Sequence, residues 1–177
     1  MGIVEQEKAN PWLGLDSNLF ETVKNSKKAF EGFNHYLDSF YSNTLKLEEK
    51  IIILMTVSFE NASNYSMSYL TYLAKNKYVN TNLIFDLRED NELKDSKLQS
   101  LRVLVKEVTR SRGYANEEVL HNFSQAGYGY GDVVDILQGI SISIFLNYLE
   151  RMFGVELDDF LDKERWEYPV KHQELEV

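Results

Sequence analysis

Two serines, Ser63 and Ser66, lie three residues apart where a helix is predicted to begin, in the stretch ENASNYSMSYLTYLA that covers residues 60–74. A serine works as a nucleophile only when a general base lies within hydrogen-bond reach and donors can hold an oxyanion. Glu60 is the one carboxylate of this stretch, and a single carboxylate is more often a surface or first-turn charge than a catalytic group. The structural interpretation is therefore favoured: Asn61 or Ser63 caps the helix, and Ser66 packs as a small first-turn residue under the preceding helix.

The three histidines do not indicate a metal site. His35 falls in an aromatic helix, His121 near the start of a charged one and His172 in the tail, so no two share a spacing that would hold a metal ion. The glycine-rich AGYGYGD, residues 126–132, looks like a phosphate-binding loop, but it follows a helix and contains no lysine. We expect it to be a turn between two helices, and we expect neither a metal nor a cofactor.

Composition and charge exclude several classes of protein. The chain has 177 residues, of which 44% are hydrophobic and 27% charged, as in ordinary globular proteins. Its net charge of −9 argues against a nucleic-acid partner, because such sites need clustered Lys and Arg. Cysteine is absent, which removes disulfides, thiolate metal sites and thiol redox chemistry. No apolar run approaches the length of a membrane span and the N-terminus lacks a targeting pattern, so we expect a cytoplasmic protein with no membrane partner.

The residues of the opening stretch must be positioned by helices, because capping residues and apolar residues at steps of three and four recur along the chain. The segment IIILMTVSF, residues 51–59, is apolar on almost every side and predicts a buried central helix, although its β-branched residues would also suit a strand. Ser17 or Asp16, Asn116 and Asp132 are predicted N-caps, and Gly32 is expected to bend a helix.

The predicted elements add up to an all-α bundle of about seven helices. We expect a single domain, 1–177, with an N-terminal arm and helix (1–28), a core (29–157) and a C-terminal tail (158–177). The tail contains a proline and many charges, which is typical of a surface arm or an extension that clasps a partner.

Three stretches of the chain together carry a family resemblance: LEEKIIILMTVSFENAS (47–63), KLQSLRVLVKEVTRSRGYANEEVLHNFSQAGY (97–128) and GDVVDILQGISISIFLNYLERM (131–152). The second is the more specific, because it has a helix ending in Arg-Gly at 112–113, a short linker, and a helix ending in Ala-Gly at 126–127 before an aromatic residue. Over about residues 33–160 the chain resembles the carboxymuconolactone decarboxylase and alkylhydroperoxidase AhpD-like family, in its peroxidase-related branch. The resemblance implies an AhpD-like helical bundle.

In redox-active members of that family, two cysteines three residues apart begin a helix, with a histidine four residues after the second and a glutamate twelve before the first. The helix dipole and the histidine lower the pKa of one thiol, and the second thiol resolves the oxidised first one. The matching positions here are Ser63, Ser66, Leu70 and Ile51. The resemblance therefore implies a degenerate redox motif with no catalytic residue of the family retained.

The frame around these positions still matches the family, which indicates where a pocket would lie. The candidate pocket residues are the neighbours of the two serines and the matching pair of the last helix: Glu60, Asn61, Tyr65, Asn147 and Tyr148. A histidine that often follows this last pair is replaced by Glu150.

Three functions from different classes remain open. The first, which we favour, is a protein without thiol peroxidase activity that acts as an oligomeric binding or scaffold protein. The resemblance implies a homo-oligomer, a trimer or hexamer, and a small apolar molecule is the candidate ligand. The second is a decarboxylase-like enzyme that needs no cysteine and acts on a small carboxylic acid or lactone by acid–base chemistry. The third is a peroxidase-related antioxidant protein, which would require thiols that the chain lacks.

Overall fold

The computed structural model describes residues 17–169, and in this range the chain forms eight α-helices, a short 3₁₀ helix and no strand. The elements, in chain order, are α1 (Asn18–Lys24), α2 (Lys27–Ser42), α3 (Leu47–Glu60), α4 (Asn64–Asn76), α5 (Thr81–Arg88), α6 (Ser96–Arg110), α7 (Glu117–Gln125), α8 (Tyr130–Phe153) and η1 (Asp159–Glu164). The all-α fold predicted from the sequence is confirmed, with more helices than the expected seven.

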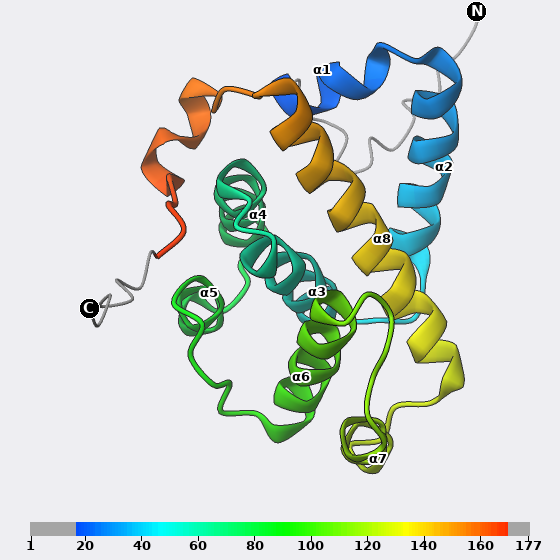
Figure 1. Cartoon of the computed structure of the whole chain (residues 1–177). Helices are drawn as coiled ribbons and strands as arrows, with labels where there is room; N and C mark the ends of the chain where they lie inside the picture. The colour runs from blue at the N-terminus through cyan, green and yellow to red at the C-terminus, as the bar shows by residue number, and fades with distance from the viewer. Residues whose placement is uncertain (1–16, 170–177) are drawn as a thin grey trace, which may run out of the picture.

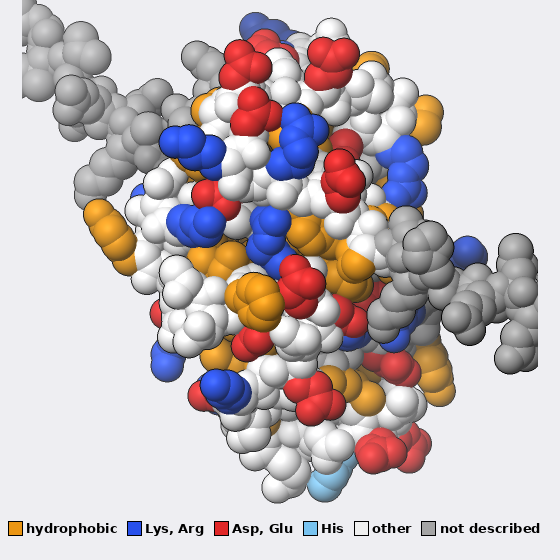
Figure 2. Space-filling model, turned by 90° about the vertical axis from the view of Figure 1, so that its left-hand side faces the viewer, with side chains coloured by type: hydrophobic (Ala, Val, Ile, Leu, Met, Phe, Trp, Pro, Cys, Tyr) orange, Lys and Arg blue, Asp and Glu red, His pale blue; other side chains and the backbone are white. Residues whose placement is uncertain are grey.

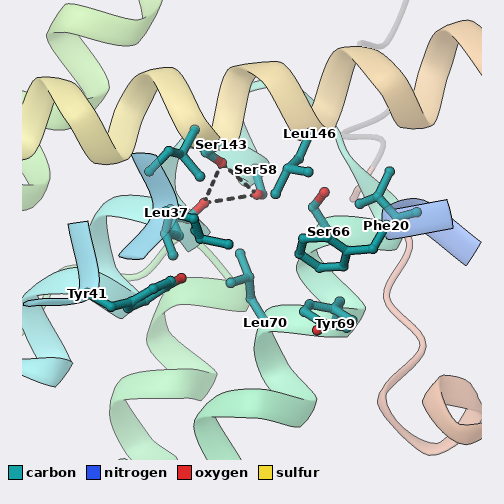
Figure 3. Close-up of a pocket in the computed structure, with 12 residues that line it drawn as sticks. Phe20, Leu37, Tyr41, Ser58, Ser66, Tyr69, Leu70, Ser143 and Leu146 are labelled. Atoms are coloured by element: carbon teal, nitrogen blue, oxygen red, sulfur yellow. Dashed lines mark hydrogen bonds between the residues drawn. The ribbon is translucent and has the colours of Figure 1, made fainter. Parts of the chain in front are cut away.

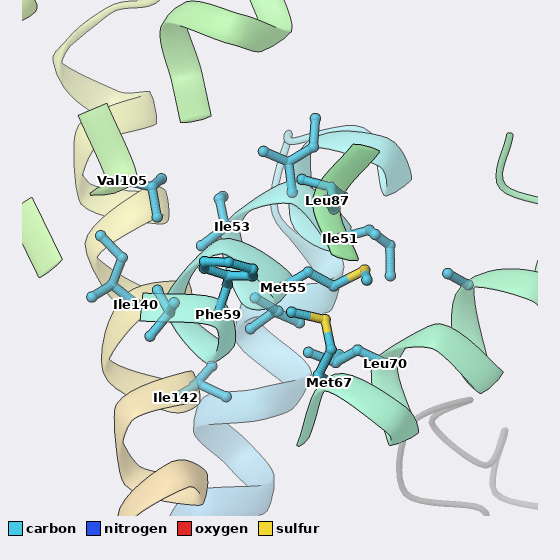
Figure 4. Close-up of a cluster of buried hydrophobic side chains, with 14 of the residues drawn as sticks. Ile51, Ile53, Met55, Phe59, Met67, Leu70, Leu87, Val105, Ile140 and Ile142 are labelled. Carbon is cyan, nitrogen blue, oxygen red and sulfur yellow. The ribbon is translucent and has the colours of Figure 1, made fainter. Parts of the chain in front are cut away.

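Helix α3 is the centre of the bundle. It packs against α4, α6 and α8, and the other helices surround these four (Figure 1). Because it is enclosed on every side, its residues from Glu49 to Phe59 are all buried, which explains a run that is apolar on almost every side. Figure 4 shows side chains of α3 meeting those of α4, α5, α6 and α8 in one hydrophobic cluster. The prediction of a helix for this segment was right.

The long helix α8 approaches the rest of the bundle most closely at Gly139. A Cβ atom on this glycine would lie 2.6 Å from the ring of Phe40 and 2.9 Å from Ile53, closer than carbon atoms pack. The absence of a side chain at this position therefore lets α8 lie directly on α2 and α3.

Two of the predicted helix caps are confirmed, and two other predictions differ from the structure. The side chain of Ser17 accepts a hydrogen bond from Phe20 N at 3.4 Å and that of Asn116 accepts one from Val119 N at 2.9 Å, so both are N-caps. Asp132 is not the cap of α8, because the helix begins one turn earlier, and its carboxylate instead accepts from Gly129 N at 2.7 Å. Gly32 does not bend a helix, since α2 runs through it, and the break falls at residues 25–26.

The segment that follows α8 packs on the bundle as far as it is described. Leu161 is fully buried and Trp166 is 5% exposed. The indole N–H of Trp166 donates to the carbonyl of Arg88 at 3.1 Å, and the Arg88 guanidinium donates to the carbonyls of Glu164 and Arg165 at 3.0 Å. Residues 158–169 are therefore a strap on the surface of α4 and α5 of the same chain; residues 170–177 of the expected tail lie outside the described range.

One helix of the described part, α8, is long and apolar enough by length and composition to cross a membrane, so the expectation that no segment reaches this was wrong by that measure. A core helix of a soluble protein passes the same test, and 33% of the apolar window of α8 is buried. On the face shown in Figure 2, lysine and arginine side chains alternate with aspartate and glutamate around hydrophobic ones. No large basic patch is visible on this face.

Candidate functional site

The site begins at the tight connection between α3 and α4. Helix α3 ends at Glu60, α4 begins at Asn64, and between them Ala62 has a positive φ of 49°, a conformation that non-glycine residues rarely adopt. The backbone N–H of Ser63 closes the turn by donating to the carbonyl of Ser58 at 2.9 Å. This turn folds the chain back and points the N-terminus of α4 at α8.

Glu150 of α8 caps the N-terminus of α4. Its carboxylate accepts hydrogen bonds from the backbone N–H of Tyr65 at 2.9 Å and of Ser66 at 3.4 Å, two amides that a helix leaves without an internal partner. It also accepts from the hydroxyls of Ser63 and, at 3.4 Å, of Ser66. Ser63 does occupy the N-cap position, but its side chain makes no capping bond. The predicted cap is thus supplied by a distant carboxylate, which the positive end of the helix dipole stabilises.

Asn147, one turn before Glu150, completes the network. Its side-chain amide donates to the hydroxyls of Ser63 at 3.0 Å and Ser58 at 3.3 Å, and its oxygen accepts from the amide of Asn61 at 2.9 Å. Asn147 and Ser63 are 1% and 2% exposed. The hydroxyl of Ser63 therefore accepts a hydrogen bond from Asn147 and donates one to Glu150. A buried polar group with both bonds satisfied has a well-defined position.

A small cavity lies beside this network, behind Ser66. Figure 3 shows side chains from α1, α2, α3, α4 and α8 around it, with the hydroxyls of Ser58 and Ser143 bonded to each other. The lining is mainly apolar and consists of Leu19, Phe20, Leu37, Tyr41, Leu54, Ser58, Ser66, Tyr69, Leu70, Ile142, Ser143 and Leu146. The volume open to water-sized molecules is about 30 Å³, enough for a water molecule or two but not for a ring.

Three of the four positions that match the redox motif lie around the site, and the fourth, Ile51, lies apart from it. Ser63 and Ser66 share the carboxylate of Glu150. Leu70 lines the cavity, and Ile51, which is fully buried, lies in the hydrophobic core and does not line the cavity (Figure 4).

The five candidate pocket residues separate into two groups. Asn61 and Asn147 bond to each other in the network, and the backbone of Tyr65 binds Glu150. Glu60 points elsewhere: it forms an ion pair with Arg110 of α6, whose Nη2 lies 3.0 Å from its Oε1, and Tyr148 is 55% exposed on the outside of α8. The structure thus gives Glu60 a structural role rather than one at the serines.

Glu150 is the residue of the site that sequence analysis did not propose. It was noticed only as a replacement for a histidine. A signal for it existed, because Ser143, Asn147 and Glu150 follow one another at steps of four and three and therefore share a face of α8. What the sequence could not indicate was that this face meets the start of α4.

The arrangement is poorly suited to nucleophilic catalysis. The carboxylate of Glu150 already accepts hydrogen bonds from two backbone amides and two hydroxyls, so it has little capacity left to take a proton from a serine. The hydroxyl of Tyr65 donates to Asp158, and burial followed by this bond raises the pKa of Tyr65 well above its ordinary value, so the phenol stays protonated. Among residues 17–169, His, Asp and Glu side chains nowhere gather in a group of three that could hold a metal ion.

Comparison with known proteins supports the fold. No family profile and no curated protein sequence matches this chain. Among solved structures, the debrominase Bmp8 superposes with a TM-score of 0.77 at 16% identity, covering 88% of this chain and 85% of that one. A cysteine-to-alanine variant of the same debrominase, solved in complex with 2,3,4-tribromopyrrole, gives a TM-score of 0.76 at 16% identity over 86% of this chain and 83% of that one.

A peroxidase-related protein from Silicibacter sp. TM1040 superposes with a TM-score of 0.74 at 15% identity, over 84% of this chain and 80% of that one. An alkylhydroperoxidase AhpD core protein from Ralstonia eutropha JMP134 gives a TM-score of 0.67 at 17% identity, over 82% and 78%. Identities this low establish a common fold and leave the activity open. The chain therefore has the AhpD-like helical fold of peroxidase-related proteins, as the sequence resemblance implied.

Proposed function

We propose that this protein has no thiol peroxidase activity and acts as an oligomeric binding protein on an AhpD-like scaffold. The observation that carries the proposal is the position of Glu150. Its carboxylate lies at the N-terminus of α4 and accepts the hydroxyls of Ser63 and Ser66. A negative charge of the chain itself thus takes the place where an anionic nucleophile or substrate group would be stabilised.

The chemical part is tested with purified protein, hydrogen peroxide, an organic hydroperoxide and a dithiol donor. We expect peroxide consumption at the rate measured without protein. Turnover above that rate, retained after the protein is repurified, would contradict the proposal.

The assembly part rests on the outer face of α8. Exposed apolar residues on one face, interrupted at Ser141, form what we call the α8 stripe: Val134, Leu137, Phe145, Tyr148 and Met152. Exposed apolar stripes of this length mark contact surfaces on soluble proteins. Such a stripe can pack against a different surface of the next copy around the three-fold axis of a trimer, or against itself across a two-fold axis of a hexamer. We propose a second copy of this chain as the partner, within a trimer or a hexamer.

Light scattering at micromolar concentration tests the assembly directly. A mass of three or six chains is expected. A monomer mass that persists when the concentration is raised tenfold or so would exclude this part of the proposal, because an interface of ordinary size holds at micromolar concentration.

Binding of a small apolar molecule is a second candidate function, and the cavity behind Ser66 favours it. Its exposed surface is entirely apolar, because the hydroxyls of Ser58, Ser66 and Ser143 are bonded to the protein, and such a lining suits an apolar molecule. The ligand of the Bmp8 variant, 2,3,4-tribromopyrrole, is also a small ring with one polar group. Thermal unfolding with and without saturating pyrrole and bromobenzene tests this: a rise of Tm with ligand concentration supports binding, and an unchanged Tm with both contradicts it.

A decarboxylase-like activity is less well supported. Such chemistry would need an acid and a base facing a substrate, and the carboxylate present, Glu150, already has four donors. His35 and His121 are exposed on α2 and α7, apart from the serine network.

A further inference from the structure

The cavity behind Ser66 is closed on one side by the first helix. Leu19 and Phe20 of α1 line it, and both are almost fully buried, at 2% and 6% exposed. The ring of Phe20 lies against those of Tyr69 and Phe33, with centroids 6.0 Å and 6.3 Å away. In Figure 3, Phe20 enters the cavity from the α1 side, opposite Leu37 and Tyr41. Displacement of α1 would therefore open the cavity and enlarge it by the volume of these two side chains.

Helix α1 is the element best suited to such a displacement. It has seven residues, too few for a helix that is stable by itself, and only residues 25 and 26 separate it from α2. In Figure 1 it lies across one end of the bundle, between the start of α2 and the end of α8. Its position must therefore depend on the contacts it makes with the body of the protein.

The polar contacts at the first turn of α1 converge on one carboxylate, that of Asp158. The backbone N–H of Asn18 donates to the two oxygens of Asp158 at 3.1 Å and 3.3 Å. The hydroxyl of Tyr65 donates to the same carboxylate and accepts from the backbone N–H of Leu19 at 3.3 Å. The side chain of Asn18 also donates to the carbonyl of Glu156 at 3.1 Å. The segment after α8 thus fastens α1 to α4.

We propose that α1 is a lid over the cavity and that the carboxylate of Asp158 is its latch. The cavity has about 30 Å³ open to water-sized molecules, so a ring-sized ligand can enter only if its wall moves. Helix α1, which forms this wall, is the shortest α-helix of the described residues. Its charged hydrogen bonds to the rest of the protein depend on one side chain, Asp158. The ligand class, a small apolar ring, rests on the second candidate function above, whereas the lid and latch stand on the contacts of α1.

The test uses the absence of cysteine, which makes a single introduced thiol the only group that a thiol reagent can modify. Val23 on α1 is 3% exposed and does not line the cavity, so Val23→Cys is a conservative reporter of lid opening. The rate at which dithionitrobenzoate modifies this cysteine is compared with and without Asp158→Asn. We expect an increase of about tenfold or more, because the loss of one charged hydrogen bond corresponds to at least that factor.

Two controls separate lid opening from general loosening. Asp159→Asn alters the neighbouring exposed acid, which makes no contact with α1 among the described interactions, and should leave the rate unchanged. Val105→Cys, fully buried in α6, should react at the same slow rate with and without Asp158→Asn. If Asp158→Asn does not fold, Tyr65→Phe removes the other half of the latch and should accelerate Val23→Cys in the same way.

The outcomes test the opening of the lid separately from the binding of a ligand. An unchanged rate at Val23→Cys, or an equal rise at Val105→Cys, overturns the lid. A rise confined to Val23→Cys supports it, whether or not bromobenzene binds. If bromobenzene does bind, its association with the Asp158→Asn variant should be faster than with the unaltered chain, and an equal rate in both would overturn the lid as the entrance.

Discussion

The two faces of α8 differ in how completely their side chains are satisfied within one chain. The inner face carries Ser143, Asn147 and Glu150, and each of these side chains is hydrogen-bonded to α3 or α4. The outer face carries the α8 stripe, whose side chains are 37% to 81% exposed although they are apolar. The inner face is therefore complete within one chain, whereas the outer face still has apolar surface to bury. The inner face of α8 thus supports the internal site, and the outer face is the surface that we propose for the contact between copies.

The largest expected effect comes from a charge on the outer face. Leu137→Glu should convert the proposed oligomer to monomers, because a carboxylate buried without a partner at an interface costs several kcal/mol. Light scattering measures the change. Leu120→Glu on α7 is the matched control, since Leu120 and Leu137 are 43% and 44% exposed. Equal masses for the two variants would show that the α8 stripe is not the interface.

A methyl group added at Gly139, on the inner face of α8, should destabilise the folded protein. Gly139→Ala places a Cβ 2.6 Å from Phe40, so it should lower the free energy of unfolding by about 3 kcal/mol, the upper part of the range for overpacking. Denaturant unfolding checks the value. Gly131→Ala in the same helix meets nothing within 4 Å and should leave stability nearly unchanged.

Removal of the Glu150 carboxylate should have the next largest effect on the free energy of unfolding. Glu150→Ala leaves the hydroxyl of Ser63 and the first amides of α4 without their acceptor. We expect the free energy of unfolding to fall by about 2 kcal/mol, because water that enters the space can replace part of the lost hydrogen bonding. Glu156→Ala, an exposed acid near the end of the same helix, should cost much less. Similar losses for both variants would mean that Glu150 does not cap α4.

The two serines should differ although both are buried. Ser63→Ala removes a hydroxyl bonded to Glu150 and Asn147 and should cost about 1 kcal/mol, whereas the hydroxyl of Ser66 has only a 3.4 Å contact with Glu150, so its loss should cost a few tenths. Thermal and denaturant unfolding of the two variants give the ranking. The reverse order would show that Ser66 matters more to the network than its geometry indicates.

The sequence predicted the fold well and the site only in part. The buried helix α3 and the caps at Ser17 and Asn116 were accessible because local apolar patterns and capping residues determine them. The role of Glu150 was not, because it depends on how α8 crosses α4, 84 to 87 residues away in the chain. Glu60 was assigned to the pocket by its proximity in sequence, but the turn at Ala62 directs it to Arg110 instead.

The carboxylate at the start of α4 has a consequence for how this site could change over time. A cysteine at position 63 would meet a fixed negative charge, which raises a thiol pKa, where a reactive thiol needs a neighbour that lowers it. Cysteines gained at positions 63 and 66 would therefore confer little reactivity while Glu150 remained. The effect of each substitution would depend on which came first, and this epistasis would make thiol chemistry hard to gain at this site by single steps.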